Sequence, residues 1–340
     1  MHPRVSGIKY LPFVSVCTVT FNRRIFWPAA LEMFRSQTYP KNRMEWIIVD
    51  DGTDKVRDLI DAAHISQIKY VALDEKLPLG AKRNLSHTYC RGEVIVYFDD
   101  DDYYPPERVS HAVETLMAHP DAMCAGAGEL YVFFPHIQKM YQCGPYKAAH
   151  ATAATFAFRR ELLATSRYED AKAMAEEKGF LKDYTVPFVQ LDPQKTILVV
   201  PHLHNTVDKK KMLARPDSEC FKESDKTIDD FIRGRSAPAM KAFFMSDIDA
   251  LLAEYVPGCY KPDAVAQIRE IEKTIEEARE KDVYAPIVVT TAGSLPRTLT
   301  SAEVIGLIRE KDARIQELTL ALLQEQQNQS PSLSKSVAFM

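Results

Sequence analysis

The sequence predicts an α/β fold in which a mostly parallel central sheet is flanked by helices on both faces. Apolar, β-branched runs alternate with amphipathic segments through the first 200 of the 340 residues, an order that is typical of βαβ units. Polar residues follow three of these runs directly. In open α/β sheets the ligand site lies beyond the carboxyl ends of the strands, so we expect these polar residues to meet at one edge of the sheet.

The individual elements follow from residue type and spacing. Strands are predicted at residues 13–21, 44–50, 68–73 and 94–98, and helices between them at 25–36, 54–63 and 80–90. Further strands are expected at 131–135, 154–159 and 196–200, with a helix-like stretch at 169–182. Beyond residue 211 the composition changes to helix formers and charges, which predicts helices near 226–233, 238–254 and 262–281.

These elements divide the chain into a predicted α/β domain, residues 1–210, and a helical extension, residues 211–283. Residues 284–300 are predicted to be a linker. Apolar residues at heptad spacing predict a helix over 301–329, which either forms a short coiled coil or packs back on the domain. Residues 330–340 are predicted to be a disordered tail.

Charge and composition exclude several classes of protein. Lysine and arginine number 43 against 47 aspartates and glutamates, so there is no basic excess to predict nucleic-acid binding. The six cysteines form no C-x-x-C pair, and we expect them to be reduced and structural. No signal-peptide pattern opens the sequence and no run reaches about 18 apolar residues, so we expect a soluble, cytoplasmic protein without a transmembrane segment.

Four consecutive carboxylates, Asp99 to Asp102, follow the fourth predicted strand. Like charges this close repel one another, and a bound divalent cation relieves the repulsion. In extended chain Asp99 and Asp101 lie on one side, so a D-x-D pair can hold one cation. The alternative explanation is a solvated loop before a helix that begins near Pro105-Pro106.

Taken in order, the motifs resemble the opening of family 2 glycosyltransferases of the GT-A fold, a Rossmann-like architecture. The stretches that carry the resemblance are VSVCTVTFNRRIFWPAALEMFRSQTYP, EWIIVDDGTD and GAKRNLSHTYCRGEVIVYFDDDDYYPPERV. The family pattern contains T-[YF]-N-R, V-D-D-G-S-x-D and D-x-D-D, and Thr53 stands here in place of the usual Ser. The resemblance covers residues 12–210 and leaves the role of the C-terminal part open.

The resemblance implies a metal-dependent, inverting glycosyltransferase that moves a sugar from a UDP- or GDP-sugar to a hydroxyl acceptor by direct displacement. Mn2+ or Mg2+ would hold the diphosphate and neutralise the charge that develops on it. The acceptor is predicted to be a glycan, a protein or a lipid-linked sugar, and the C-terminal helices are candidate surfaces for homo-oligomerisation. Two other functions fit the same sheet: a catalytically silent binding or assembly module, and a nucleotidyltransferase, although TVTFNRR lacks that class's glycine-rich loop.

The resemblance also implies roles for individual residues. Nucleotide-sugar binding is implied for Thr20, Phe21, Asn22, Arg23, Asp51, Lys82, Arg83, Asn84, Asp99 and Asp100. Metal binding is implied for Asp101 and Asp99, with His202 as a further ligand and His204 as the second choice. Sugar or acceptor contacts are implied for Tyr103, Tyr104 and Asp102.

Several of these residues also have a simpler structural explanation. Asp50-Asp51-Gly52 is also a plain turn sequence, and residues 82–84 also suit an exposed helical face. Tyr103 and Tyr104 could instead pack the loop. A histidine at a strand end is often only hydrogen-bonded.

An inverting transfer needs a carboxylate base, and family members place it in an acidic pair well beyond the D-x-D motif. We predict Glu177 as this base and Glu176 as the second choice, because the Gly-Phe-Leu that follows resembles the continuation of the family's motif. Glu169-Asp170 is a competing pair, and a solvated helix face is the structural alternative. The lysine run 209–211 either closes over the diphosphate or is merely solvated.

Overall fold

The computed structural model describes residues 10–146, 148–173, 176–206, 208–214, 220–258 and 264–270, with positions 273, 287–289 and 297–299 and a few between 306 and 318. Its contacts separate two units, Met1–Arg269 and Glu270–Met340.

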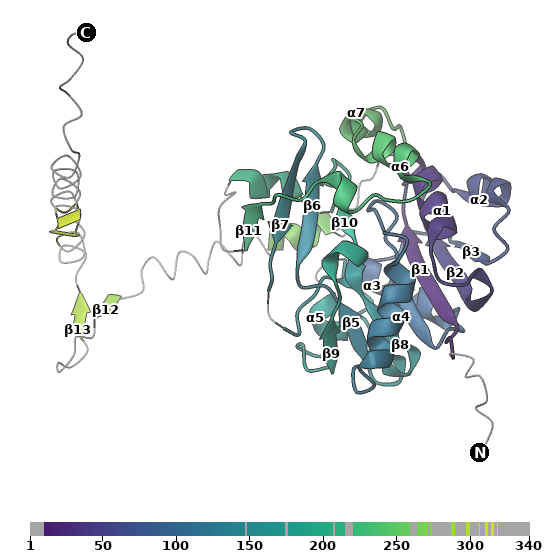
Figure 1. The fold of residues 1–340 in the computed structure, drawn as a ribbon, viewed down its shortest axis with the longest axis horizontal. Helices are drawn as coiled ribbons and strands as arrows, with labels where there is room; N and C mark the ends of the chain where they lie inside the picture. Colours follow the sequence, from purple (N-terminus) through teal and green to yellow (C-terminus); the bar gives the residue numbers. More distant parts are fainter. Residues whose placement is uncertain are drawn as a thin grey trace, which may run out of the picture. The chain divides into compact units, whose positions relative to one another are not determined.

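A seven-stranded sheet forms the centre of the first unit, in the order β3-β2-β1-β4-β8-β5-β9 (Figure 1). Its strands are β1 (Val14–Thr20), β2 (Met44–Asp50), β3 (Ile68–Ala72), β4 (Val94–Tyr97), β5 (Cys124–Gly126), β8 (Ala157–Arg159) and β9 (Phe188–Gln190). The pairs β3-β2, β2-β1, β1-β4 and β5-β9 are parallel, and β8 runs antiparallel to both of its neighbours. The predicted α/β class with a mostly parallel sheet is confirmed.

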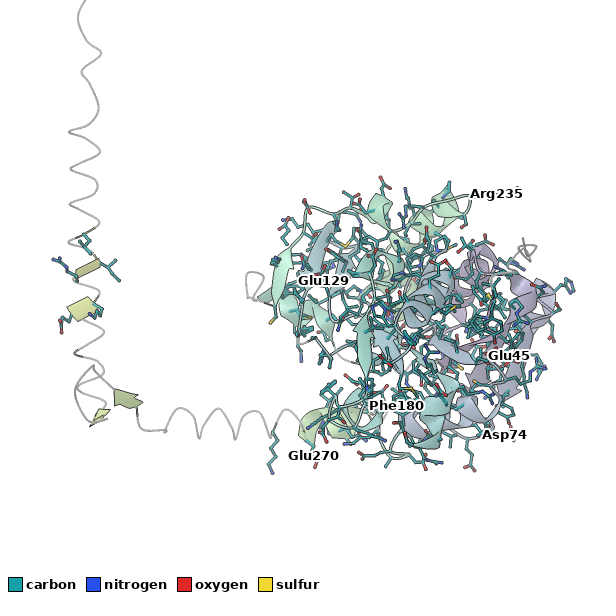
Figure 2. The ribbon with its side chains drawn as sticks, turned by 60° about the horizontal axis from the view of Figure 1, so that its bottom comes forward. Glu45, Asp74, Glu129, Phe180, Arg235 and Glu270 are labelled. Carbon is teal, nitrogen blue, oxygen red and sulfur yellow. The ribbon has the colours of Figure 1, made fainter. Side chains whose placement is uncertain are left out.

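Helices cover both faces of this sheet. The main ones are α1 (Trp27–Ser36), α2 (Arg57–Ala63), α3 (Leu79–Thr88), α4 (Arg108–Ala118) and the short α5 (Glu177–Phe180). Strand side chains alternate between the faces: Val16 and Ile48 join the apolar cluster that contains α1 and α4. Ile47 and Tyr97 join a second cluster on the α3 side, to which α5 adds Phe180 (Figure 2). The two-sided burial explains why these strands are continuously apolar.

The first unit also contains a second, four-stranded sheet, in the order β10-β6-β7-β11. It consists of β6 (Leu130–Phe134), β7 (Lys139–Cys143), β10 (Leu198–Val199) and β11 (Phe221–Glu223). Tyr103, just after the aspartate run, forms a β-bridge with Leu198 of β10. This pairing brings the segment that follows β10 to the aspartates, although about a hundred residues separate them in the chain.

The described residues of the first unit also contain seven 3₁₀ helices. These are Arg24–Phe26, Lys41–Arg43, Ala153–Thr155, Arg160–Ala164, Pro193–Lys195, Lys209–Ala214 and Ile228–Asp230. The predicted helix over 238–254 is two helices, α6 (Ala237–Phe244) and α7 (Ile248–Ala253). The break falls at Asp247, whose side chain caps α7 by accepting the Ala250 N–H at 3.0 Å.

Other predicted helices also differ. Within the predicted helix at 169–182, the described residues are helical only at α5, and the predicted helix at 226–233 is a 3₁₀ turn. Of the predicted helix at 262–281, residues 264–270 are described, and they are helical. Sequence analysis missed β5, β7, β9 and β11.

In the second unit, β12 (Ile287–Val289) and β13 (Arg297–Leu299) pair antiparallel within the predicted linker. Most of the predicted helix 301–329 and all of the tail 330–340 lie outside the described residues, so those domain boundaries stay predictions. The described cysteines are free thiols. Within the part of the chain that is described, no helix has both the length and the apolar character needed to cross a membrane.

Candidate functional site

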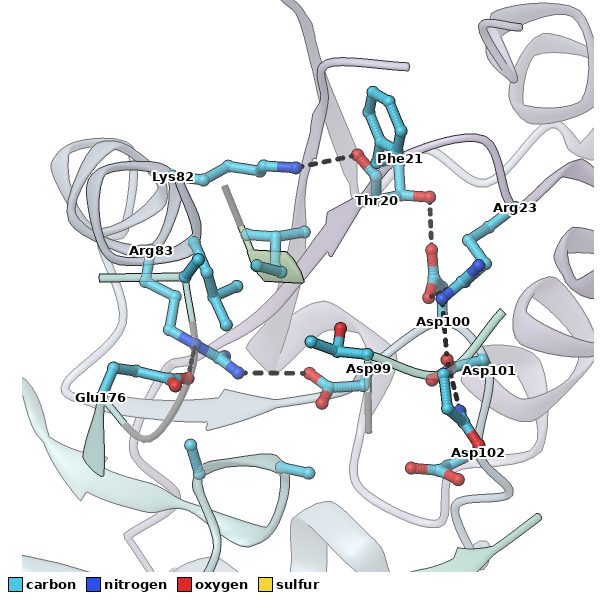
Figure 3. Close-up of a pocket in the computed structure, with 18 of the residues that line it drawn as sticks. Thr20, Phe21, Arg23, Lys82, Arg83, Asp99, Asp100, Asp101, Asp102 and Glu176 are labelled. Carbon is cyan, nitrogen blue, oxygen red and sulfur yellow. Dashed lines mark hydrogen bonds and ion pairs between the residues drawn. The ribbon is translucent and has the colours of Figure 1, made fainter. Parts of the chain in front are cut away.

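The carboxyl ends of β1 and β4 open into a pocket of about 460 Å³, a volume in the range of small-molecule sites. All four aspartates line it, together with groups from distant parts of the chain: Thr20, Phe21, Arg23, Lys76, Lys82, Arg83, Glu176, Glu177, Asn205, Thr206 and Lys209 are among them. Figure 3 shows Arg83 with Glu176 and Asp99 in one part of the pocket, and Arg23 with Asp100 and Asp101 in another. The polar strand ends therefore meet, as the strand order predicts.

The four aspartates have different surroundings. Asp100 is buried, accepts a hydrogen bond from the Thr20 hydroxyl and lies 3.8 Å from Arg23 Nε. Asp102 is buried too, and its Oδ1 accepts the Val200 N–H at 3.1 Å. Burial, reinforced by the charge of Asp101, raises the pKa of Asp102 to about 8. Asp100 and Asp102 therefore stabilise the loop that follows β4. The side chains of Asp99 and Asp101 are 26% and 16% exposed.

Among the four aspartates, Asp101 has surroundings that stabilise its negative charge. Burial alone would raise its pKa, but a hydrogen bond from His202 and the charge of Arg23 outweigh burial and hold the pKa well below its usual value. Its Oδ2 lies 3.1 Å from His202 Nε2, 3.4 Å from Arg23 NH2 and 3.5 Å from Asn205 Nδ2. The sequence analysis did not assign Asn205 a role.

His202 lies behind Asp101 and does not line the pocket. Its Nδ1 accepts the backbone N–H of His204 at 3.2 Å, which favours the neutral tautomer whose Nε2 donates to Asp101, and the Asn205 amide nitrogen lies 3.0 Å from the same Nε2. Burial lowers the pKa of His202, against the opposing effect of Asp101, and favours this neutral form. His202, which is predicted to bind the metal, thus donates a hydrogen bond to Asp101 in the structure.

Arg83 links the acidic pair to the aspartates. Its guanidinium donates to Glu176 Oε1 at 2.9 Å and lies 3.8 Å from Asp99 Oδ1. Burial disfavours the Arg83 charge, yet Asp99 and Glu176 together raise its pKa well above the usual value. Both Arg83 and Glu176 are nearly fully buried. Removing one partner of such a pair typically costs about 3–5 kcal/mol, because the other charge is left uncompensated.

Glu177, at the start of α5, is less enclosed than Glu176 and also lines the pocket. Burial and then the charge of Glu176 raise its pKa above the usual value. A carboxylate with a raised pKa, beside a neighbour already occupied by Arg83, is the better proton acceptor of the two. The competing pair, Glu169-Asp170, is exposed and does not line the pocket.

Two of the predicted nucleotide contacts, Asn22 and Asn84, bond to other parts of the chain in the structure. Asn22 adopts a left-handed conformation, φ 51°, and its Oδ1 accepts the N–H groups of Thr53 and Asp54 at 2.8 and 3.1 Å. The Asn84 side chain bonds to Tyr168 and Asp170. Neither side chain lines the pocket, because each satisfies backbone groups of a neighbouring loop.

Asp51, another predicted nucleotide contact, also bonds within the chain. Its side chain is fully covered, with Lys82 bound to Oδ1 and the Leu77 N–H donating to Oδ2 at 2.9 Å. Lys82 in turn donates to the Thr20 carbonyl at 3.3 Å. Asp51 therefore orients Lys82 at the pocket wall, and both of its oxygens are occupied within the chain.

Tyr103 and Tyr104, which are predicted to contact the sugar, both have buried rings. Tyr104 stacks on Phe98, with ring centroids 4.4 Å apart, and its hydroxyl accepts the Asp99 N–H at 2.8 Å. Asp102, predicted beside them, is buried as well. The ring of His204, the second choice of metal ligand, lies 6.2 Å from the Tyr255 ring, and His204 does not line the pocket.

A profile of known proteins described as Glycosyl transferase family 2 matches residues 15–165, which carry β1 to β8 and the aspartate run. These residues form a family 2 glycosyltransferase domain. The family that the sequence motifs resemble is thereby confirmed.

Curated relatives are similar to the same region of this chain. A putative glycosyltransferase EpsH of Bacillus subtilis (strain 168) is 31% identical over 121 residues, which are 35% of this chain and 35% of its own. A putative colanic acid biosynthesis glycosyl transferase WcaA of Escherichia coli (strain K12) is 30% identical over 123 residues, 35% of this chain and 42% of its own. The chain thus matches less than half the length of these relatives.

Solved structures with a similar chain path include a mannosyltransferase PcManGT from Pyrobaculum calidifontis in complex with GDP-Man and Mn2+. It is 15% identical, with a TM-score of 0.47, over 78% of this chain and 81% of its own. S. aureus TarS 1-349 in complex with UDP-GlcNAc is 18% identical, with a TM-score of 0.42, over 55% of this chain and 58% of its own.

Proposed function

We propose that this protein transfers a glycosyl group from a nucleoside-diphosphate sugar to a hydroxyl acceptor, with inversion at the anomeric carbon. The observation that carries the proposal is one pocket that combines cationic side chains, suited to a diphosphate, with Glu177, a carboxylate whose raised pKa suits a base. The names of the curated relatives support the same class of reaction.

The donor nucleotide is proposed to lie between β1 and α3. Arg23, Lys82 and Lys209 place positive charge around the pocket, where charge-assisted hydrogen bonds to phosphate oxygens are strong. Phe21 lines the pocket, and the ammonium groups of Lys76 and Lys82 lie 5.5 and 5.8 Å from the centre of its ring. Its ring offers a nucleobase an aromatic face to pack against.

In the proposed reaction, Glu177 accepts the proton of the acceptor hydroxyl while the hydroxyl oxygen bonds to the anomeric carbon. The bond from that carbon to the diphosphate oxygen breaks, and the nucleoside diphosphate leaves with the electron pair. Glu176 remains bound to Arg83 and fixes the start of α5. Asp99, on the other side of Arg83, is proposed to orient the donor.

Mg2+ or Mn2+ is proposed at Asp101. Among the described residues, no three His, Cys, Asp or Glu side chains converge to hold a cation by themselves. Mg2+ commonly takes only one or two protein carboxylates together with substrate phosphates, so Asp101, with Asp99 as a second carboxylate, fits a cation that binds together with the diphosphate. When bound, the cation would neutralise negative charge on the departing diphosphate.

A panel of nucleotide-sugars tests the proposed function. Full-length protein with Mn2+ and each UDP- or GDP-sugar is followed by thermal unfolding. A ligand at about 100 times its Kd adds about 2.7 kcal/mol to the free energy of unfolding, so one donor series should raise the melting temperature measurably. If no donor raises it, and none releases nucleoside diphosphate with any acceptor, the proposed function is wrong.

Metal and nucleotide are expected to bind cooperatively. Since Asp101 and the diphosphate would share the cation, Mn2+ should raise the affinity for UDP or GDP by about 5–150-fold. Isothermal titration with Mn2+ present and with EDTA measures the factor. Tight binding of Mn2+ to the nucleotide-free protein would contradict the shared site.

The pH dependence of transfer should report Glu177. A base works only when ionised, and the pKa of Glu177 lies above its usual value. We therefore expect turnover to fall as the pH drops through this raised pKa, at a higher pH than an ordinary glutamate would give. Rates at saturating donor from pH 4 to 8 check this, and the acidic limb should disappear in Glu177→Gln.

A further inference from the structure

The segment after β10 forms one side of the pocket. The described residues of this segment are 201–206 and 208–211, here called the 201–211 loop, and its last three residues begin the 3₁₀ helix Lys209–Ala214. Asn205, Thr206 and Lys209 of this loop line the cavity. Lys209 interacts electrostatically with Asp99, Asp101 and Asp102. Lys210 does not line this pocket, although it is the next residue. The structure therefore distinguishes two adjacent lysines that the sequence does not.

Asp249 of α7 binds both arms of this loop. Its Oδ1 accepts the Leu203 N–H at 2.8 Å, and its Oδ2 accepts from Lys210 Nζ. The Asp249 and Lys210 side chains are only 23% and 31% exposed, so this pair is better shielded from solvent than a surface ion pair. The two bonds span the part of the loop that carries Asn205 and Lys209.

The helices α6 and α7 are a firm support for this contact. Phe243 packs edge-on against Phe26, with ring centroids 5.9 Å apart, and Phe244 packs against Tyr103 at 5.8 Å. Ile248 and Leu252 of α7 are buried. All of these helical residues lie beyond the stretch that matches the family 2 profile, yet Phe243 and Phe244 pack on residues beside the candidate site.

We propose that Asp249 is a positioning residue that holds the 201–211 loop with Lys210 turned away from the pocket and Lys209 turned toward the diphosphate. The proposal rests on the proposed function, since it assigns the diphosphate as the ligand of Lys209. It gives the helical extension a role in the site: α7 selects which lysine of the run meets the donor.

Limited trypsin digestion tests the loop contact without any substrate. The full-length protein carries three adjacent cleavage sites, Lys209 to Lys211. Hydrogen bonds to charged groups contribute about 1.5–3 kcal/mol, so their loss in Asp249→Ala should speed cleavage in this run by about 10–100-fold. Mass spectrometry locates the cuts. Asp229→Asn is the matched control, because it removes another aspartate–lysine pair, with Lys241, on an exposed side chain.

Nucleotide binding tests the position of Lys209. Asp249→Ala and Lys209→Met should each weaken binding of UDP or GDP with Mn2+ by about tenfold or more, as expected when a charge-assisted hydrogen bond is lost. The double variant should be no weaker than Lys209→Met alone. Asp249→Asn, which keeps an acceptor for Leu203, should lie between wild type and Asp249→Ala. Lys211→Met, at an exposed position outside the pocket, should bind like the wild type.

The outcomes separate the two proposals. Unchanged cleavage in Asp249→Ala, at an unchanged melting temperature, overturns the loop contact. Faster cleavage with wild-type nucleotide affinity overturns the positioning of Lys209. If the wild-type protein binds neither nucleotide, the proposed function and the assignment of Lys209 both fail, while the digestion still decides whether Asp249 holds the loop.

Discussion

Glu177→Gln is expected to lower the rate of sugar transfer by about 10²–10⁴-fold, the usual contribution of a positioned base. Glutamine fills nearly the same space but cannot take the proton of the acceptor hydroxyl. Because Arg83 bonds to Glu176 and not to Glu177, the buried ion pair is kept. Donor affinity should therefore stay at the wild-type value. Release of nucleoside diphosphate at saturating donor measures the rate, and titration with UDP or GDP measures the affinity.

Asp183→Asn is the matched control for this variant. It also removes a carboxylate just after α5, but from a side chain that is 77% exposed. Asparagine tolerates the left-handed backbone at this position, φ 54°, so we expect wild-type turnover. Glu169→Gln and Asp170→Asn test the competing pair. Lost turnover in either one, together with normal turnover in Glu177→Gln, would place the base elsewhere.

Strand order made much of the site predictable. Parallel strands bring their carboxyl ends to one edge, so residues at the ends of β1 and β4 had to meet there, as Thr20 and Asp100 do. The two candidates for the catalytic base, Glu176 and Glu177, could be identified only through the family resemblance. In the structure Arg83 engages Glu176 and leaves Glu177 at the pocket, which is why Glu177 is the proposed base.

Residues that satisfy buried backbone groups were not predictable in the same way. Asn22 matches a family motif, but the motif does not show that its side chain turns to the backbone of residues 53 and 54. Tyr103 and Tyr104 follow the aspartates directly, and only the packing on Phe98 and Phe244 shows that their rings are buried. Buried polar and aromatic groups need tertiary partners, and these come from elements far along the chain.

The contacts of Asp249 are the clearest example of what could not be predicted from the sequence. Its partners, Leu203 and Lys210, precede it by 46 and 39 residues, and no motif links them. The sequence analysis assigned α6 and α7 to an extension with an open role. The break at Asp247, which sets the start of α7 and hence the place of Asp249, depends on one capping side chain.

Asp101→Asn is expected to lower turnover by at least about 10²–10³-fold, the usual effect of removing one group that stabilises charge in the transition state. The amide oxygen can still accept the proton of His202 Nε2, which lies 3.1 Å from Asp101 Oδ2, so the loop should keep its conformation. What is lost is the negative charge for a cation. The tighter binding of UDP or GDP in the presence of Mn2+ should therefore disappear along with activity. Asp74→Asn, at an exposed position (Figure 2), is the matched control. Wild-type turnover in Asp101→Asn, or an unchanged effect of Mn2+ on nucleotide affinity, would show that this carboxylate holds no cation.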